Sequence, residues 1–231
     1  MSLSDQDSER KSMNVTDFTA RRTMMVDTQV RPSDVTKFPI IDAMLSVPRE
    51  AYLPADLQEA AYAEQTLSLS ADRIMLEPRT LAKMLDALNI QATDVAMDIA
   101  CGTGYATAIL AHMCDFVVGV EDDATLSARA QEVMTAEGID NAVIVQDALT
   151  AGAPKSGPYD VIIVQGAVND LPDDLLAQLR EGGRIACIFA QGQLGTVRIG
   201  LKIDGVVNWR FAFNASAPLL AGFEKEAAFV L

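Results

Sequence analysis

The stretch Asp98-Ile-Ala-Cys-Gly-Thr-Gly104 decides the fold, because it joins two different sequence patterns. Before it, Val95 to Ala100 is a short apolar run typical of a fully buried strand, and after it Gly104 to Met113 has the pattern of a helix. A glycine-rich turn between a strand and a helix lets backbone N–H groups approach a ligand closely. The stretch therefore predicts a strand–turn–helix unit with a ligand at the turn.

The same alternation of strand and helix patterns continues after the turn. Further buried strands are expected at Phe116 to Val120, Ala142 to Val145, Val161 to Val164 and Arg184 to Phe189, and helices at Ala124 to Glu137 and Pro172 to Arg180. Gly182-Gly183 is expected to end the last of these helices. Strands that alternate with crossover helices form a parallel sheet.

The end of the chain has the pattern of antiparallel strands. Thr196 to Ile203 and Val206 to Phe213 flank Asp204-Gly205, a dipeptide typical of a tight hairpin turn, and Ala227 to Leu231 is one more expected strand. The prediction is an α/β fold: a Rossmann-like, doubly wound, mostly parallel seven-stranded sheet with helices on both faces and antiparallel C-terminal strands.

The part of the chain before the sheet is expected to have two sections. Residues 1–12 are polar and are predicted to be a flexible tail. Residues 13–78 are predicted to form a helical and loop extension on the substrate side, with two short helices between Asn14 and Val47. Pro78 is expected to open a helix, and residues 79–231 to form the cofactor-binding domain.

Composition limits the partners of the protein. Of its 231 residues, 32 are acidic and 18 are Lys or Arg, so the formal net charge is -14. Nucleic-acid binders need Lys and Arg to displace counterions, so no nucleic-acid partner is expected. We expect no membrane partner, because no apolar stretch has the length of a bilayer span. The three cysteines are widely spaced and His112 is the one histidine, which favours a reducing cytoplasm and neither disulfides nor a metal site.

The turn itself discriminates among nucleotide-like ligands. The dinucleotide fingerprint requires Gly or Ala where this chain has Thr107, and Asp98 would repel a pyrophosphate. A carboxylate at this strand end instead suits a ligand with a positive amine or sulfonium, such as S-adenosylmethionine. Glu121 ends the second strand, where an acid can accept hydrogen bonds from both ribose hydroxyls, and Asp147 ends the third, where it can accept one from an adenine amino group.

A single acid of this kind is more often a helix N-cap or an exposed loop charge. Here three acids follow three consecutive strands, which favours a shared ligand. We therefore predict an S-adenosylmethionine site that comprises the glycine turn, the strand-end acids and their neighbours. Its predicted residues are Asp98, Ala100, Gly102, Gly104, Tyr105, Glu121, Asp122, Asp147, Ala148 and Gln165.

Several stretches resemble one methyltransferase family. They are Asp98-Ile-Ala-Cys-Gly-Thr-Gly-Tyr-Ala-Thr-Ala-Ile-Leu-Ala111, Val118-Gly-Val-Glu121, Tyr159-Asp-Val-Ile-Ile-Val164, Leu171-Pro-Asp-Asp-Leu-Leu-Ala-Gln-Leu-Arg-Glu-Gly-Gly-Arg184, Gln29-Val-Arg31 and Val47-Pro-Arg-Glu50. From about Met24 to about Phe189, the chain is similar to the protein-L-isoaspartate O-methyltransferase family. The resemblance implies an S-adenosylmethionine-dependent enzyme that repairs damaged proteins by methylating the carboxylate of an isoaspartyl residue.

One family element, a loop that reads Gly-Gln-Thr-Ile-Ser shortly before a proline, has two placements in this chain. Gln65-Thr-Leu-Ser68 copies its letters but lies too far before Pro78. Counting without gaps from Tyr62 to Pro78 places Asp72-Arg-Ile-Met-Leu76 on the loop, and we favour this placement. It replaces the family's hydroxyl side chains with Ile74 and Leu76, which cannot donate a hydrogen bond.

This replacement leaves the catalytic residues and the methyl acceptor open. The acceptor is a protein or peptide with a free carboxylate, or a small molecule. A third alternative is a regulatory protein that binds S-adenosylmethionine without transferring its methyl group. Arg73 and Arg79 either dock an anionic substrate or are two solvated surface arginines.

Overall fold

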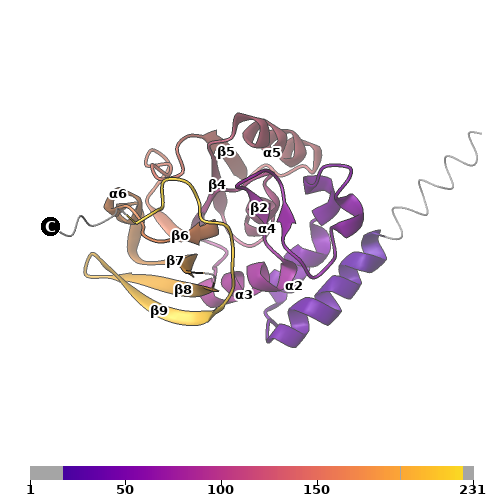
Figure 1. Ribbon diagram of the computed structural model, residues 1–231, viewed down its shortest axis with the longest axis horizontal. Helices are drawn as coiled ribbons and strands as arrows, with labels where there is room; N and C mark the ends of the chain where they lie inside the picture. Colours follow the sequence, from indigo (N-terminus) through magenta and orange to yellow (C-terminus); the bar gives the residue numbers. More distant parts are fainter. Residues whose placement is uncertain (1–17, 193, 226–231) are drawn as a thin grey trace, which may run out of the picture.

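The computed structural model of the protein describes residues 18–192 and 194–225 and has a seven-stranded sheet at its centre (Figure 1). The strand order is β5-β4-β3-β6-β7-β8-β9. The strands are β3 (Val95–Ile99), β4 (Phe116–Glu121), β5 (Ala142–Gln146), β6 (Tyr159–Val168), β7 (Leu179–Gln191), β8 (Leu194–Ile203) and β9 (Val206–Asn214). The neighbouring strands β5, β4, β3, β6 and β7 pair in parallel, whereas β8 pairs antiparallel with both β7 and β9. The predicted Rossmann-like, mostly parallel sheet is confirmed.

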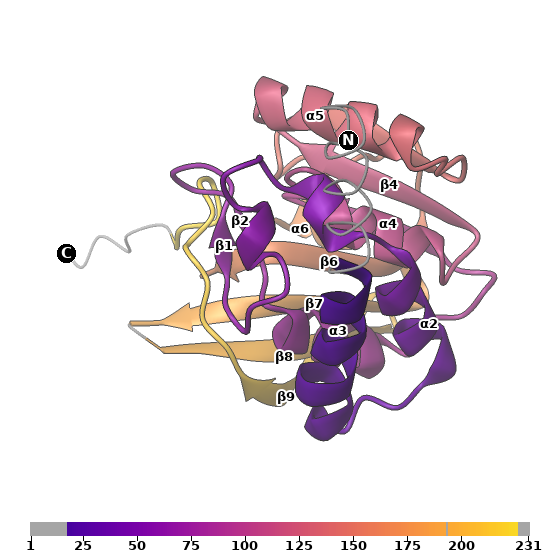
Figure 2. The same ribbon diagram turned by 90° about the vertical axis from the view of Figure 1, so that its right-hand side faces the viewer.

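Four helices cover one face of the sheet. They are α2 (Phe38–Ser46), α3 (Pro78–Leu88), α4 (Tyr105–Ala111) and α5 (Ala124–Ala136), and Figure 2 shows α2 and α3 in front of the strands. Successive strand residues point to opposite faces, so Ala96 and Val117 join the core beneath these helices, while Met97 and Val118 join a second core. The short apolar runs of β3 and β6 are thus buried on both sides. The run in β5, predicted to be fully buried, is not, because β5 is an edge strand in which Ile144 is buried but Val143 is 37% exposed.

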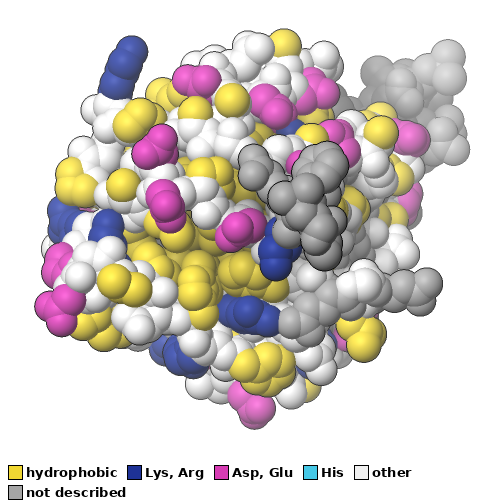
Figure 3. All heavy atoms as spheres, turned by 60° about the vertical axis from the view of Figure 1, so that its left-hand side comes forward, with side chains coloured by type: hydrophobic (Ala, Val, Ile, Leu, Met, Phe, Trp, Pro, Cys, Tyr) yellow, Lys and Arg dark blue, Asp and Glu magenta, His cyan; other side chains and the backbone are white. Residues whose placement is uncertain are grey.

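The second face has a thinner cover. Its one described helix, α6 (Asp173–Ala177), has 5 residues, and irregular segments that carry Leu149, Leu220 and Phe223 complete the core there. Figure 3 brings this side of the molecule forward and shows apolar side chains at the surface between charged ones. Helices therefore lie on both faces, as predicted, but very unequally.

The helix expected from Pro172 to Arg180 is shorter than predicted, and the role expected for Gly182-Gly183 is wrong. The helix ends at Ala177, and β7 begins at Leu179. Tyr159 pairs with Leu179, and Val161 pairs next with Arg184, so the glycine pair lies in the irregularity between these two pairings. Gly182 has a φ of 76°, which suits a bulge as well as it suits a helix end.

The C-terminal hairpin is as predicted. Asp204 and Gly205 have φ angles of 52° and 77°, the two positive values that a tight hairpin turn requires. The expected strand from Ala227 to Leu231 and the expected tail at residues 1–12 lie outside the described residues.

Before the sheet, the structure is helical and then irregular. A helix at residues 18–25 continues into the π-helical turn η1 (Val26–Val30) and the 3-10 turn η2 (Arg31–Ser33), and α2 follows. Two further 3-10 turns, η3 (Arg49–Tyr52) and η4 (Gln58–Ala60), lead to a hairpin. Its strands β1 (Leu67–Ser68) and β2 (Ile74–Met75) pair antiparallel, and Pro78 opens α3 as predicted. Among the described helices, none has the length and apolar character to cross a membrane.

Candidate cofactor site

The glycine turn reverses the chain between β3 and α4 through three positive φ angles. Ala100 has φ 58°, Gly102 58° and Gly104 90°. A Cβ atom on Gly102 would lie 2.7 Å from Cδ1 of Leu69, which belongs to the β1–β2 hairpin. The hairpin therefore lies directly on the turn, and Gly102 is needed both for its backbone angle and for this close approach.

The predicted polar residues lie along one edge of the sheet. Asp98 lies in β3, Glu121 ends β4, Asp147 follows β5, and Gln165 lies in β6. These four strands are adjacent in the order β5-β4-β3-β6. The carboxyl ends of parallel strands are where ligands bind in open α/β sheets.

Asp98 is fully buried and is bound by two side chains of the protein. Its Oδ2 accepts a hydrogen bond from Oγ1 of Thr107 at 2.7 Å, and its Oδ1 accepts one from Nε2 of Gln165 at 3.0 Å. Burial raises the pKa of Asp98 to about 7, although both hydrogen bonds oppose the shift. Thr107, the residue that breaks the dinucleotide fingerprint, thus has a specific partner that the sequence did not reveal.

Glu121 has no exposed surface and accepts three hydrogen bonds. Its Oε2 accepts from the backbone N–H of Gly102 at 2.8 Å, and its Oε1 accepts from the backbone N–H of Asp123 at 3.1 Å and from Nε of Arg73 at 2.9 Å. Burial raises the pKa of Glu121, and these donors oppose that shift. Donors of the protein therefore occupy three of the roughly four acceptor positions of this carboxylate.

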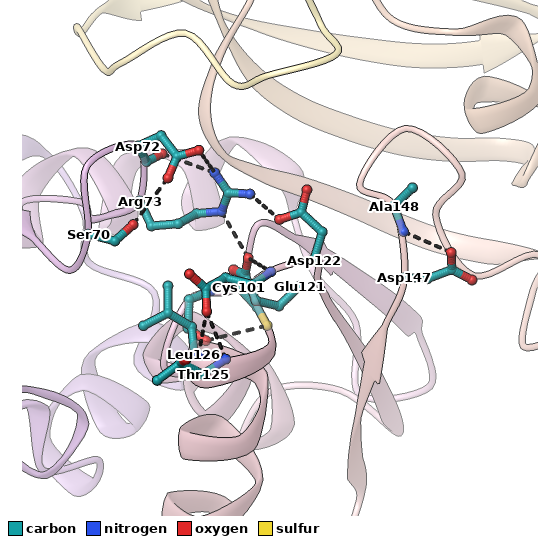
Figure 4. Close-up of polar contacts among 12 residues, drawn as sticks. Ser70, Asp72, Arg73, Cys101, Glu121, Asp122, Thr125, Leu126, Asp147 and Ala148 are labelled. Carbon is teal, nitrogen blue, oxygen red and sulfur yellow. Dashed lines mark hydrogen bonds and ion pairs between the residues drawn. The ribbon is translucent and has the colours of Figure 1, made fainter.

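Arg73 occupies neither of the two environments expected for it, a docking site for an anionic substrate or the solvated surface. Its side chain is 2% exposed and reaches from the hairpin toward Glu121 and Asp122, with ion pairs to both and to Asp72 (Figure 4). Burial would lower the pKa of Arg73, but attraction by Glu121 and Asp122 raises it. Arg73 is thus not a solvated surface arginine, and acids of its own chain hold it. Arg79 donates from Nε to Oγ of Ser33 at 3.2 Å.

Asp147 and Ala148 lie apart from this cluster (Figure 4). Both are exposed, and Oδ1 of Asp147 accepts a hydrogen bond from the backbone N–H of Ala148 at 2.8 Å. The structure thus brings Asp147 to the predicted edge of the sheet as a surface residue.

Tyr105 turns toward the N-terminal segment. Its ring centroid lies 5.7 Å from that of Tyr52 and 4.8 Å from the guanidinium carbon of Arg49. Arg49 is fully buried and donates from Nε to the carbonyl oxygen of Ala61 at 2.7 Å and from Nη2 to that of Leu76 at 2.8 Å. Its Nη1 has no hydrogen-bond partner among the described residues. Sequence reasoning gave Arg49 no site role, and its only signal was the Val-Pro-Arg-Glu element.

Both placements of the family loop lie in the one hairpin. Ser68, in β1, is exposed, and its hydroxyl donates to the carbonyl oxygen of Ser70 at 2.7 Å. Leu76, just after β2, is buried and lines a cavity together with Ile74 and Tyr105. This cavity also reaches Cys101 and Gln165 and is small, with about 10 Å³ of room for a water-sized sphere. The apolar residues of the gapless placement therefore face the glycine turn, and Ser68 faces solvent.

Cys101, within the turn, is a buried free thiol. Burial raises its pKa well above the ordinary value, with Asp98 and Glu121 adding to the shift. A thiol that stays protonated is a poor nucleophile. Cys101 is therefore a small packing residue of the bend.

The chain has close relatives among known proteins. Residues 21–198 match the family model described as Protein-L-isoaspartate(D-aspartate) O-methyltransferase (PCMT). The chain is 33% identical over 194 residues to a protein-L-isoaspartate O-methyltransferase of Koribacter versatilis. The aligned region covers 84% of this chain and 87% of that protein. A relative of the same name from Methylorubrum extorquens is 34% identical over 175 residues, 76% of each chain.

Solved structures share the fold. One named protein-L-isoaspartate O-methyltransferase matches 87% of this chain and 66% of its own with a TM-score of 0.79 and 23% identity. A protein described as a putative enzyme of that name from Plasmodium falciparum, in complex with S-adenosyl-L-homocysteine, matches 87% of this chain and 97% of its own. Its TM-score is 0.75 and its identity 21%.

Proposed function

This chain belongs to the protein-L-isoaspartate(D-aspartate) O-methyltransferase family, and we propose that it methylates a carboxylate of isoaspartyl residues in damaged proteins, with S-adenosylmethionine as the donor. The observation that carries the proposal is the family match over residues 21–198, which includes the glycine turn and the strand-end acids.

The residues at the turn fit this cofactor in charge and in backbone geometry. Gly102 and Gly104 adopt positive φ angles, and the acids Asp98, Glu121 and Asp147 lie at the carboxyl ends of adjacent strands. We propose that Glu121 accepts the ribose hydroxyls and Asp147 the adenine amino group. Asp98 would face the methionine end, with Thr107 and Gln165 fixing its carboxylate. The remaining predicted residues, Ala100, Tyr105, Asp122 and Ala148, would shape the rest of the site.

When bound, S-adenosylmethionine would supply a methyl group on a cationic sulfur. The acceptor carboxylate is already ionised, so the chain needs no general base and contributes alignment and exclusion of water. The hairpin is suited to exclude water because Leu69, Ile74 and Leu76 line the cavity beside the turn. We propose that residues 13–78 supply this substrate side and that residues 79–231 hold the cofactor.

Three buried free thiols support a reducing, cytoplasmic location for this repair activity. Cell fractionation tests that part of the proposal.

A second candidate function has one observation in its favour. Ile74 and Leu76 give the cavity an apolar wall where the family loop has hydroxyls, which suits a less polar acceptor, such as a small molecule. A protein that binds the cofactor without transferring methyl is the remaining alternative.

The test is transfer of isotope-labelled methyl from S-adenosylmethionine. We expect label in a peptide with an isoaspartyl residue and none in the same peptide with aspartate. Substitution of Leu76 is expected to change the rate, while Ser68→Ala leaves it unchanged. Label only in a small-molecule extract would favour the second candidate, and binding without transfer to peptide, lysate protein or extract would favour the third.

A further inference from the structure

The β1–β2 hairpin closes the predicted cofactor site. Leu69 lies on Gly102, and the cavity left beside the turn has about 10 Å³ of room for a water-sized sphere, which is enough for about one water molecule. A nucleoside with an amino-acid chain therefore needs the hairpin to move.

Arg73 holds the hairpin in this closed position. The backbone oxygen of Arg73 accepts from the N–H groups of Leu69 at 2.8 Å and Ser70 at 3.2 Å, so its backbone belongs to the turn that covers Gly102. Its side chain is buried in ion pairs to Glu121 and Asp122. Movement of the turn away from Gly102 therefore requires these two ion pairs to break or stretch.

In the proposed site, the cofactor also needs the carboxylate of Glu121. A carboxylate offers about four acceptor positions, and three of those on Glu121 are in use, one of them by Arg73. Two ribose hydroxyls and Arg73 cannot all be accommodated with the two backbone donors. We propose that Arg73 is a latch that competes with the ribose of the cofactor for Glu121, so that the cofactor binds only when the hairpin opens. This inference rests on the proposed role of Glu121 in cofactor binding.

The latch predicts a tighter complex when it is weakened. The apparent affinity of a site is its intrinsic affinity multiplied by the fraction of molecules that are open. A closed state favoured about tenfold over the open one therefore weakens binding about tenfold. Arg73→Gln removes the charge and, on the gapless placement, introduces the residue that the family loop has there. We expect this variant to bind S-adenosylhomocysteine at least about tenfold more tightly than the unmodified protein in calorimetry. The probe has a neutral sulfur, so loss of an arginine charge does not by itself attract it.

Arg184→Gln is the matched control. Arg184 forms a partly buried ion pair with Asp94 over 2.7 Å at the start of the strands, far from their carboxyl ends. This variant loses the same charge and a similar pair, and we expect the affinity for S-adenosylhomocysteine to stay unchanged. Asp122→Asn weakens the latch from the acid side, and we expect it to tighten binding in the same direction, which keeps the test decisive if Arg73→Gln does not fold.

Stopped-flow binding gives a second readout. In the unmodified protein the observed rate should level off at high ligand concentration, where hairpin opening limits it, and in Arg73→Gln it should keep rising linearly. Equal or weaker binding in both latch variants overturns the proposal, as does absence of binding in every variant. If both variants bind tighter yet no isoaspartyl peptide is methylated, the latch stands and the proposed acceptor fails.

Discussion

Arg49 donates from Nη2 to the carbonyl oxygen of Leu76 over 2.8 Å, and this hydrogen bond ties the end of the β1–β2 hairpin to η3. Its Nε binds the carbonyl oxygen of Ala61 in the same way. Arg49 thus fixes the base of the hairpin, while Arg73 fixes its turn.

We expect Arg49→Met to lower the free energy of unfolding by about 2 kcal/mol, because two buried carbonyl oxygens lose their donors. Urea denaturation measures the change. Arg31→Met is the control, since Arg31 pairs with Asp27 on an exposed surface, and its effect should stay within about 0.5 kcal/mol. Equal effects of the two substitutions would contradict the role given to Arg49.

Asp98 predicts a specific pH dependence of stability. Its carboxyl has a pKa of about 7 in the folded protein, raised by burial, against an ordinary value of about 4 in an unfolded chain. The folded state therefore binds the proton more tightly, and the stability that Asp98 contributes is lost as pH rises from about 4 to about 7, by at most about 4 kcal/mol. Asp98→Asn cannot titrate, and Gln165 can turn its amide oxygen toward the new side chain. The stability of the unmodified protein minus that of the variant should fall between pH 4.5 and pH 7.5, whereas parallel curves would refute the shift.

A matched pair of variants separates the two reasons for a glycine at position 102, its backbone angle and its close contact with Leu69. Gly102→Ala places a side chain at φ 58° and brings Cβ to 2.7 Å from Leu69, whereas Gly138→Ala has φ 68° with no atom within 4 Å. We expect a loss of about 1 kcal/mol for Gly138→Ala from the angle alone, and a larger loss for Gly102→Ala. Adding Leu69→Ala to Gly102→Ala should recover the excess. Thermal unfolding measures all of these, and no excess at Gly102 would mean that the hairpin does not lie on the turn.

Asp147 can be tested with a cofactor analogue that carries hypoxanthine in place of adenine. The analogue has a carbonyl where adenine has its amino group, so Asp147 would lose a hydrogen bond. We expect the unmodified protein to prefer S-adenosylhomocysteine about fivefold, corresponding to about 1 kcal/mol. Asp147→Ala should lose this preference and keep its stability within about 0.5 kcal/mol, since Asp147 is exposed. An unchanged preference in calorimetry would assign the adenine to other residues.

The hydrophobic periodicity and the turn residues of the sequence predicted most of the sheet. The apolar runs correspond to β3 to β7, and Asp204-Gly205 forms the turn between β8 and β9, because both signals depend on residues close in sequence. The error at Gly182-Gly183 has the same origin. Positive φ serves a helix end and a bulge alike, and only the pairing of Tyr159 with Leu179 decides between them.

The interactions within the site were harder to predict. Arg73 and Glu121 are 48 residues apart, and nothing local marks Arg73 as buried. From the sequence, an arginine at that position is expected to be a surface or substrate-binding residue. Only the fold shows that the end of β4 lies beneath it. Thr107 was noticed for breaking a glycine pattern, whereas its hydrogen bond to Asp98 depends on the helix packing over the strand.

The three bonds of Glu121 have a practical consequence for anyone who needs an inactive reference protein. Replacing this residue with alanine would delete a ligand-binding acid, but it would also remove one ion-pair partner of the buried Arg73 guanidinium and the acceptor of the backbone amides of Gly102 and Asp123. Such a protein would differ from the parent in loop position and folding as well as in chemistry. Asp147 is the better place to weaken the site, because among the described residues its side chain has one hydrogen bond, to the adjacent Ala148.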